Sequence, residues 1–584
     1  MRKTACCLLA ALLLFVLGCS GRKTTDRERQ KDPWDKIAED TDTSDREKKQ
    51  GTIEGYRSST VTLDGEEYPF YGCVYDVLSD GTARLTLIQD WKYLGAIPEA
   101  VDGKTVSTLG RDLFSEEYIS SASITIPDSV IAVEGNPFGC EGMVSKIVVS
   151  ASHPTLEVVD GVLFSKPDHR LICACLRTND EYHIPEGTKR IEDHAFRHAA
   201  VCYGTIFIPD SVTELGQNPF AFCNRSKETG PYRIELSETH PTLQIVDDML
   251  YSKPDRRLVC YANSEAERGV RGSRFVEEGT RAIDDFAFYR HENRFESLEI
   301  YIPDSVRTMG INPFYGRDVQ IVLTGSRYFQ LEGGLLYDKM HNRLVSALPT
   351  SLSPDVIVRG GTEVIGAYAF AGSEAVQTVS LPDSVREVGD MAFCDNTKIT
   401  TCNIPQGVRR IGVCAFAGCW QLETKMALQG GVVIEAGAFG PMAAGIGAGV
   451  TELTITGKGG AVIGNSAFSY CRGLTKVMID AGESYIGSQA FSHTGLEEVS
   501  FGEGLVSLGG RVFMECGGLR GYSLVLPASL RYIGDLTNDM AQKYNETFHA
   551  YMTEYICTMD IHVTAGSYAE EYCRENDIPY KYAS

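Results

Sequence analysis

The stretch TVSLPDSVREVGDMAFCDNTKI, residues 378–399, decides the fold because its pattern returns along the chain. It opens with alternating β-branched and aliphatic residues, which predict a short strand. Pro-Asp-Ser predicts a turn, since proline fixes φ and the two polar residues tolerate the bend. Val-Arg-Glu-Val alternates again, so its valines face inward and its charged side chains face water. The unit therefore reads as two short strands around a turn.

The Ala-Phe pair that closes the unit sets its period. In the second half of the chain, successive phenylalanines follow at spacings of 23, 23, 23, 29, 23 and 22 residues. A period in the twenties marks a solenoid with one coil per repeat. We expect these phenylalanines to line up in the core: Phe196, Phe288, Phe370, Phe393, Phe416, Phe439, Phe468, Phe491 and Phe513.

Two further positions recur in each unit. A glycine follows the second strand, as at Gly389, where we expect a tight turn or a positive φ. A cysteine often stands three residues after the phenylalanine, and a small apolar side chain in a stacked interior is the favoured interpretation over a ligand set or redox pairs. These cysteines are Cys223, Cys419, Cys471 and Cys516.

The first half of the chain repeats a longer, composite unit. IPDSVIAVEGNPF from Ile126 returns as IPDSVTELGQNPF from Ile208 and as IPDSVRTMGINPF from Ile302. Between these copies lie hairpin-like stretches, PTLEVVDGVLFSKPDHRLICA from Pro154 and PTLQIVDDMLYSKPDRRLVCY from Pro241, in which Lys-Pro-Asp predicts the turn. Each composite unit is then a coil, a β-hairpin and a second coil.

The pattern resembles the BspA-type leucine-rich repeats of bacterial surface proteins. NIPQGVRRIGVCAFAGCWQL from Asn403 carries it best, and the stretches from Asp80 and from Ile561 resemble the family's opening and closing segments. The resemblance implies a β-rich α/β solenoid, an array of leucine-rich repeats of about 23-residue coils with hairpin insertions in the N-terminal half.

The organisation that follows has six parts. We expect a lipoprotein signal peptide, a charged disordered tether, an N-terminal capping segment, composite repeats with hairpins, regular 23-residue repeats and a C-terminal cap. In that order they cover residues 1–19, 20–50, 51–120, 121–350, 351–535 and 536–584.

The N-terminus predicts export. Arg2 and Lys3 precede an apolar run of thirteen residues, which is shorter than the roughly 20 needed to span a bilayer and is typical of a signal peptide. Gly18 before Cys19 resembles a lipobox, so we expect Cys19 to be lipidated; an ordinary signal peptide with an incidental cysteine is the alternative. Residues 21–50 hold eighteen charges in thirty positions and cannot bury enough apolar surface to fold.

The charge and cysteine content of the sequence argue against certain partners and ligands. Residues 51–584 contain 44 basic and 69 acidic residues, a net charge of −25, which disfavours nucleic acid. Fifteen cysteines follow Cys19, an odd number without any CxxC, which argues against a complete disulfide framework and a zinc knuckle.

Catalytic and metal-binding signatures are weak. His194 and His198 stand four apart, as helical metal ligands do, but they flank a core Ala-Phe pair. His153 and His240 precede proline in two copies of one unit, where a role in the turn is favoured over catalysis. No GxSxG, HExxH or GxxxxGK[ST] motif occurs, and no pair of carboxylates is singled out by spacing. We expect no cofactor, no metal and no enzymatic activity.

Specialised surface is expected where the period breaks: at the loop from Phe288, at the insertion from Gly440 and at the segment from Asp535, which has helical character. Tolerated insertion or end-capping is the plainer interpretation of all three. The 28 tyrosines are a rich supply for contacts with protein or sugar.

The resemblance implies a cell-envelope protein that presents an extended repeat surface to extracellular protein or glycan ligands, held to the membrane only by its lipid anchor. One alternative is an envelope enzyme that processes glycans in an acidic groove, which a convergent pair of carboxylates with raised pKa would favour. The other alternative is a structural spacer, which should tolerate the loss of whole coils.

Overall fold

The computed structural model describes most of the chain from Ser58 to Ala583. Cys19, the tether and the segment that begins at Asp535 lie outside the described residues. The described ranges are 58–63, 66–71, 73–88, 97–111, 113, 122–138, 144–175, 177–178, 181–197, 199–201, 204–222, 233–262, 272–289, 298–316, 319–441, 445–534, 559–576 and 578–583.

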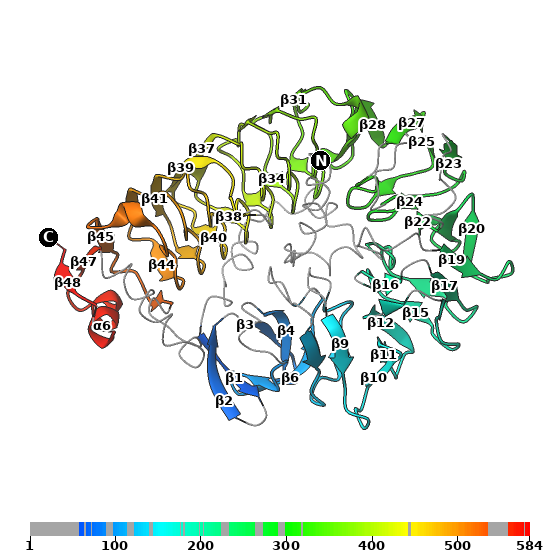
Figure 1. The fold of residues 1–584 in the computed structure, drawn as a ribbon, viewed down its shortest axis with the longest axis horizontal. Coiled ribbons are helices and arrows are strands. Elements are labelled where there is room, and N and C mark those ends of the chain that lie inside the picture. The colour runs from blue at the N-terminus through cyan, green and yellow to red at the C-terminus, as the bar shows by residue number, and fades with distance from the viewer. Residues whose placement is uncertain are drawn as a thin grey trace, which may run out of the picture. The chain divides into compact units, whose positions relative to one another are not determined.

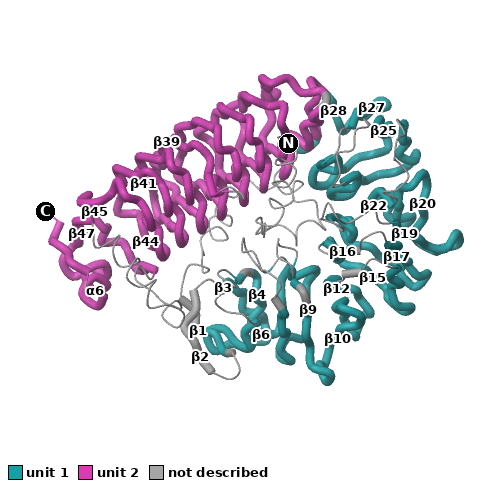
Figure 2. Tube along the Cα trace, viewed as in Figure 1, with its two compact units in different colours: residues 1–331, 339–341 teal, residues 332–338, 342–584 magenta. Residues whose placement is uncertain are grey.

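The chain divides into two compact units (Figure 2). Residues 1–331 and 339–341 form unit 1, and residues 332–338 and 342–584 form unit 2. Both are built of β-coils, about 16 in total and about 24 residues each, close to the expected 23. A continuous cluster of buried apolar side chains runs through unit 2 from Leu335 to Ile578, so the core follows the stack of coils.

Two ladders of parallel strands run along opposite sides of unit 2 (Figure 1). The strand before each proline turn pairs with its counterpart one coil later, as Thr378 pairs with Thr401, and the strand after the turn does the same, as Arg410 pairs with Val433. The first ladder comprises two sheets. One contains β31 (Asp355–Ile357), β33 (Thr378–Ser380) and β35 (Thr401–Cys402), and the other contains β37 (Thr424–Gln429), β39 (Val450–Gly457), β41 (Lys476–Ala481) and β43 (Glu498–Phe501). The second consists of β32 (Val364–Ile365), β34 (Glu387–Val388), β36 (Arg410–Ile411), β38 (Val432–Ile434), β40 (Ala461–Ile463), β42 (Ser484–Ile486), β44 (Leu505–Leu508) and β46 (Tyr532–Ile533).

The α/β class expected from the sequence is not supported, because helix makes up only 3% of the residues that the structure describes. The third stretch of each coil, which holds the Ala-Phe pair, is a series of turns. It includes two left-handed residues, one before the alanine and one two positions after the phenylalanine, such as Met391 (φ 52°) and Asp395 (φ 56°). A left-handed residue interrupts a right-handed helix, so this stretch does not become helical.

The turn stretch forms a third coil-to-coil ladder. The Phe370 N–H donates to the Ala392 carbonyl at 2.7 Å, and the Phe393 N–H donates to the Ala415 carbonyl at 2.7 Å. The left-handed residues join in, as Met391 N–H donates to the Val413 carbonyl at 2.8 Å. All three stretches of a coil therefore bond to the next coil through the main chain, which satisfies the buried peptide groups.

The phenylalanines form a stacked column inside unit 2. From Phe370 to Phe439, successive ring centroids lie 4.8–5.0 Å apart with interplanar angles of 4–8°. The column continues through Phe468 and Phe491 to Phe513, and every ring in it is at most 2% exposed. In unit 1, Phe196 and Phe288 are also fully buried and stack on Phe220 and Phe314.

The side chain three residues after the phenylalanine donates a hydrogen bond. The Cys419, Cys471 and Cys516 thiols donate to the carbonyl oxygens of Phe393, Phe439 and Phe491 in the preceding coil, at 3.1–3.2 Å. In the same position, Asn396 donates to the Phe370 carbonyl at 2.9 Å. The position therefore selects a small buried donor, which goes beyond the apolar role expected from the sequence; Cys223 lies outside the described residues.

Glycine is required after the second strand for a reason other than the positive φ expected from the sequence. Neither Gly389 nor Gly412 has a positive φ. A Cβ at Gly412 would lie 2.5 Å from the Asp390 nitrogen, and one at Gly389 would lie 2.6 Å from the Ala367 nitrogen. The backbones of neighbouring coils approach too closely here for any side chain.

Unit 1 contains the composite repeats. Each begins with three antiparallel strands, and the last of these pairs in parallel with a strand of the next coil. In the first repeat, β11 pairs with β12, and β12 then pairs in parallel with β15. The first repeat has β10 (Leu156–Val159), β11 (Val162–Ser165), β12 (Arg170–Ala174), β13 (Arg177–Thr178), β14 (Tyr182–His183), β15 (Arg190–Ile191), β16 (Ala200–Val201), β17 (Thr205–Ile208), β18 (Glu214–Leu215) and β19 (Arg233–Leu236). The second has β20 (Leu243–Val246), β21 (Met249–Ser252), β22 (Arg257–Tyr261), β23 (Ser273–Phe275), β24 (Ala282–Ile283), β25 (Leu298–Pro303), β26 (Thr308–Met309) and β27 (Val319–Thr324). The third hairpin begins in unit 1 with β28 (Phe329–Glu332). Its other strands, β29 (Leu335–Asp338) and β30 (Arg343–Ala347), belong to unit 2 and are followed by a short 3-10 helix, Pro349–Ser351.

Each end of the chain has its own elements. The first sheet contains β1 (Ser58–Leu63), β2 (Glu66–Tyr71), β3 (Cys73–Val77), β4 (Ala83–Ile88), β5 (Ala100–Val101), β6 (Lys104–Leu109) and β8 (Ala132–Val133), beside the pair β7 (Ala122–Thr125) and β9 (Val144–Val148). The C-terminal elements are the 3-10 helix Gly517–Leu519, β45 (Ser523–Leu526), β47 (Asp560–Val563), α6 (Tyr568–Glu575) and β48 (Tyr580–Tyr582). Ser567 caps α6 by accepting the Glu570 N–H at 3.2 Å.

The phenylalanine column predicts the largest stability effects. Phe416→Ala removes a fully buried ring that stacks on both neighbours, so we expect a loss of about 3–5 kcal/mol in the free energy of unfolding. Phe275→Ala is the matched control, because that ring is 57% exposed and its loss should cost no more than about 0.5 kcal/mol. Equal urea midpoints for the two variants would contradict the packing role.

The buried thiols should be chemically inert in the folded protein. Burial raises the pKa of Cys402 to about 12 and also raises the pKa of Cys419 and of Cys471, so almost no thiolate is present at pH 8. We expect N-ethylmaleimide to leave these three residues unmodified in the native chain and to label all of them in guanidinium chloride, as read by peptide mass spectrometry. Native labelling of Cys471 at the rate of a free thiol would show that the site opens.

Candidate ligand-binding face

A solvent-facing row of aromatic side chains lies on the first-ladder sheets of unit 1. Each aromatic residue stands just before the apolar residue that leads into a turn, in the stretches HIPEGT, FIPDSV, FVEEGT and YIPDSV. Strand alternation turns the next residue into the core and this one outward. We call the aromatic face the set of His183, Phe207, Phe275, Tyr301, Glu181, Glu235 and Glu299.

The first pair lies on the sheet β14-β17-β19. His183 and Phe207 are opposite each other in the parallel ladder, and their rings stack at 4.3 Å with an interplanar angle of 2°. The His183 side chain is 66% exposed and lies 3.6 Å from the Glu181 carboxylate. On the other side, Glu235 is opposite Phe207 and forms an ion pair with Arg233 at 3.0 Å.

The second pair occupies the equivalent place on the sheet β23-β25-β27. Phe275 and Tyr301 are opposite each other and stack at 4.5 Å with an interplanar angle of 18°. Glu299 lies on the same face of β25, two residues from Tyr301, and accepts a 3.0 Å hydrogen bond from the Ser273 hydroxyl. Its hydrogen bond to Tyr301 is the main cause that raises the pKa of that phenol.

The corresponding face of unit 2 carries aliphatic, hydroxyl and charged side chains at the positions described next, in place of stacked aromatic pairs. Ile357 and Ser380 stand where unit 1 has its aromatic pairs, and they are likewise opposite each other. Further along, exposed charges alternate in sign from coil to coil: Lys425 pairs with Glu452 at 2.6 Å, and Lys476 pairs with Glu498 at 2.7 Å. Its charges are therefore largely neutralised within the sheet.

Sequence reasoning searched for breaks in the period and reached the aromatic face only in part. The stretch singled out from Phe288 runs to Tyr301 and includes Glu299, but it contains neither Phe207 nor Phe275. Its residues 290–297, and residues 535–558 of the segment from Asp535 to Asp560, lie outside the described residues. At the break from Gly440, the described residues that follow lead into β39. A usable signal was present: an aromatic residue directly before Ile-Pro or Val-Glu in consecutive coils of the composite repeats.

His153 and His240 hold the turns in which they stand. The His240 Nδ1 accepts the main-chain N–H groups of Thr242 and Leu243 at 3.4 and 3.1 Å, and its Nε2 donates to the Pro209 carbonyl at 3.0 Å. His153 makes the same three contacts in its own repeat. His194 is buried with its Nε2 3.7 Å from Asp285, and His198 lies outside the described residues. Among the described side chains, no group of three or more His, Cys, Asp or Glu could hold a metal ion.

Carboxylates with raised pKa do not mark a substrate cleft. Burial raises the pKa of Asp284 to about 7, but the side chain is 2% exposed and its carboxylate accepts a 2.7 Å hydrogen bond from Arg257. Burial, helped by Glu374, raises the pKa of Asp395 to about 6 at one of the left-handed turn positions. These two groups serve an internal ion pair and a coil turn.

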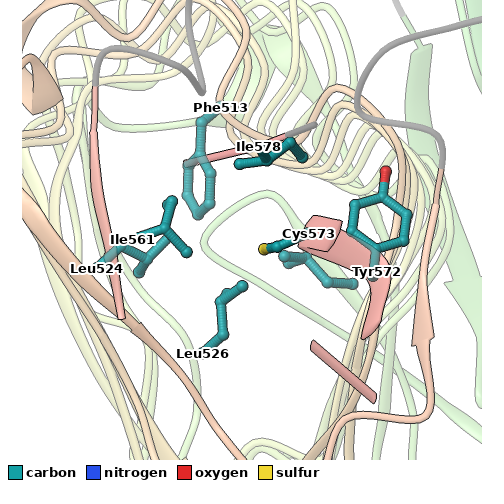
Figure 3. Close-up of a pocket in the computed structure, with 8 residues that line it drawn as sticks. Phe513, Leu524, Leu526, Ile561, Tyr572, Cys573 and Ile578 are labelled. Atoms are coloured by element: carbon teal, nitrogen blue, oxygen red, sulfur yellow. The ribbon is translucent and has the colours of Figure 1, made fainter. Parts of the chain in front are cut away.

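A small apolar cavity lies between the last coils and the C-terminal elements (Figure 3). Its lining is apolar: the Cys573 sulfur faces the cavity, and the Tyr572 hydroxyl points away from it and donates to the Gly534 carbonyl. It therefore belongs to the core and offers no polar groups to orient a ligand. The lining residues are Leu508, Phe513, Leu524, Leu526, Ile561, Tyr572, Cys573 and Ile578. In the part of the chain that is described, no helix has the length and apolar character to cross a bilayer.

Parallel coils of about 24 residues, with a stacked core and short strands, define a leucine-rich repeat solenoid. A family model described as the BspA type leucine rich repeat region matches the sequence in six copies, over residues 174–236, 351–442 and 449–546. The chain therefore carries BspA-type leucine-rich repeats, as the sequence predicted. The matched family is a repeat family, and no catalytic family is indicated.

Several solved structures align with most of the chain at low identity. A leucine rich cell surface protein from Faecalibacterium prausnitzii is 15% identical over 83% of this chain and 97% of its own, with a TM-score of 0.29. The pneumococcal vaccine antigen PcpA is 14% identical over 90% of this chain and 98% of its own, with a TM-score of 0.28. A leucine-rich repeat protein from Bacteroides ovatus is 15% identical over 80% and 99%, with a TM-score of 0.23. The comparison with curated proteins found no match.

The buried His240 predicts a loss of stability in acid. Burial lowers the pKa of His240 below its ordinary value of about 6.5, so the unfolded chain binds a proton there that the folded chain does not. Stability is therefore complete above about pH 6.5 and falls as the pH drops from there to the folded pKa. His240→Ser should weaken this dependence, because Ser326 makes the two main-chain hydrogen bonds in the third hairpin without a titrating group.

The measurement compares urea midpoints of the two chains at pH 7.5 and pH 5.5. His240→Ala is the control for the turn itself: it leaves buried N–H groups without an acceptor and should cost about 1–3 kcal/mol at both pH values. An identical fall in midpoint between the two pH values for the native chain and for His240→Ser would exclude His240 as a source of the acid sensitivity.

Proposed function

We propose that this protein is an exported binding protein of the bacterial cell surface, which uses the outward side of its leucine-rich repeats to hold an extracellular protein or glycan. The observation that carries the proposal is the aromatic face. Two stacked aromatic pairs stand at equivalent, solvent-facing positions of successive composite repeats. Large rings that remain exposed beside hydrogen-bonding groups are typical of the centres of binding surfaces.

The proposed location rests on the first residues of the chain. The short apolar run followed by Gly18 and Cys19 supports export and lipidation, and the charged tether would let the repeats stand away from the membrane. BspA-type repeats are consistent with such a surface role. The protein is proposed to act without chemistry: the described carboxylates with raised pKa serve packing and turns, and the described cavity is apolar.

Adhesion of cells that display the protein tests the proposal. We expect the native chain to raise attachment of a non-adherent bacterial host to epithelial cells or extracellular matrix, and the Phe207→Ala/Phe275→Ala variant to lose most of this gain. Ile357→Ala is the matched control, because it truncates the equivalent position of unit 2, a side chain that is 79% exposed.

The anchor is tested in the same cells. Cys19→Ser should release the chain into the medium and abolish attachment while leaving the soluble protein able to bind the same surface. Equal attachment by the native and aromatic-face variants, at equal amounts of displayed protein, would remove the basis of the proposed function.

A further inference from the structure

The aromatic face has the chemistry to recognise positive charge. We infer that its ligand is a polypeptide segment that carries several Lys or Arg side chains, each held by an aromatic pair and a neighbouring carboxylate. This inference rests on the proposed function and specifies the partner of the same face.

The second pair shows the recognition geometry most clearly. Phe275 is 57% exposed, so a face of the stacked Phe275–Tyr301 pair remains open to solvent. A Lys ammonium or Arg guanidinium within about 6 Å of such a ring is attracted by the negative face of the π system. Arg adds planar stacking of its guanidinium on the ring.

Glu299 supplies the matching charge. Its carboxylate lies on the same strand face as Tyr301 and is oriented by the hydroxyl of Ser273 at 3.0 Å. Within the described residues, the groups that contact it are hydroxyls, and it forms no ion pair with a basic side chain. A cation over the rings would therefore meet an oriented carboxylate that has not been neutralised internally.

The first pair also combines stacked rings with carboxylates, in the preceding composite unit, although Thr205 stands where the second pair has Glu299. His183 and Phe207 form the stacked platform, and Glu181 and Glu235 lie on either side of it. Arg233 partly neutralises Glu235, so this copy should be the weaker one. Two such places along one face suit an extended chain with cations at intervals, because the second contact is then made at high effective concentration.

The charge of the whole chain favours the same partner. The sequence has a net charge of −23, which attracts cationic partners over a distance and repels anionic ones. In unit 2, Glu452 and Glu498 of the first ladder are each paired with a lysine of the preceding coil, Lys425 and Lys476. Glu299 of the aromatic face has no such partner among the described residues, so its charge remains available.

The test uses the full-length chain and a fluorescein-labelled peptide of five Gly-Lys repeats, followed by fluorescence anisotropy at 0.15 M salt. We expect Phe275→Ala to raise Kd about threefold and Phe207→Ala/Phe275→Ala about tenfold, as losses of cation–π contacts at exposed sites would. These variants change no charge, so a general attraction to the acidic chain cannot produce the effect. Glu299→Gln should raise Kd to a similar extent as Phe275→Ala.

Two controls separate this recognition from its alternatives. Ile357→Ala and Glu497→Gln, which alter exposed positions of unit 2, should leave Kd unchanged. The same peptide with all lysines acetylated should bind at least tenfold more weakly, and cellohexaose should not displace the native peptide.

Peptide binding that is equal in the native chain and in the aromatic variants overturns the inference, as does equal binding of the acetylated peptide. Displacement by the oligosaccharide also overturns it and assigns the face to neutral glycans. If any of these three outcomes is found but the aromatic variants still lose adhesion, the proposed binding function stands and only the cationic peptide is rejected as the ligand. If neither adhesion nor peptide binding responds to the variants, both proposals fall together.

Discussion

Main-chain hydrogen bonding between neighbouring coils is the constraint on which the other features depend. In unit 2, neighbouring coils bond along two sets of parallel strands and one ladder of turns, so equivalent residues of most coils stand against each other one repeat away. This stacking of coils places the Phe393 ring between the rings of Phe370 and Phe416, with neighbouring ring centroids 4.8 Å apart. It also brings Gly412 so close to the Asp390 backbone that no Cβ fits between them.

The same constraint explains which features the sequence could predict. Positions that repeat with one residue type, such as the phenylalanines and the glycines, are visible as a period, and the period alone predicts a solenoid. The reasons for those residue types were less accessible. The cause at Gly412 is a close approach rather than a positive φ, and Cys419 is retained as a donor to the Phe393 carbonyl. Both reasons involve the neighbouring coil, which a single repeat read alone does not contain.

The α/β class and the location of the candidate site were harder to predict for two physical reasons. Left-handed conformations at residues such as Met391 and Tyr470 have no clear sequence signature, because non-glycine residues adopt them here under tertiary constraint. The aromatic face was reached from the sequence only at Glu299 and Tyr301, because its other residues obey the period. Phe275 and Tyr301 occupy ordinary strand positions, and their ligand-binding potential arises only when two coils place them in contact.

In a solenoid, side chains at the same position of successive repeats form a column on the surface. The two units carry different side chains in the equivalent columns. In unit 2 alternating Lys and Glu neutralise each other along the first ladder, as Lys476 and Glu498 do, which stabilises the sheet surface modestly and leaves little charge for a partner. In unit 1 the equivalent columns hold stacked rings and Glu299, whose charge is not cancelled by the next coil. Because ring faces and carboxylates both attract cations, a partner can supply the positive charge that Glu299 does not receive from the described ladder residues.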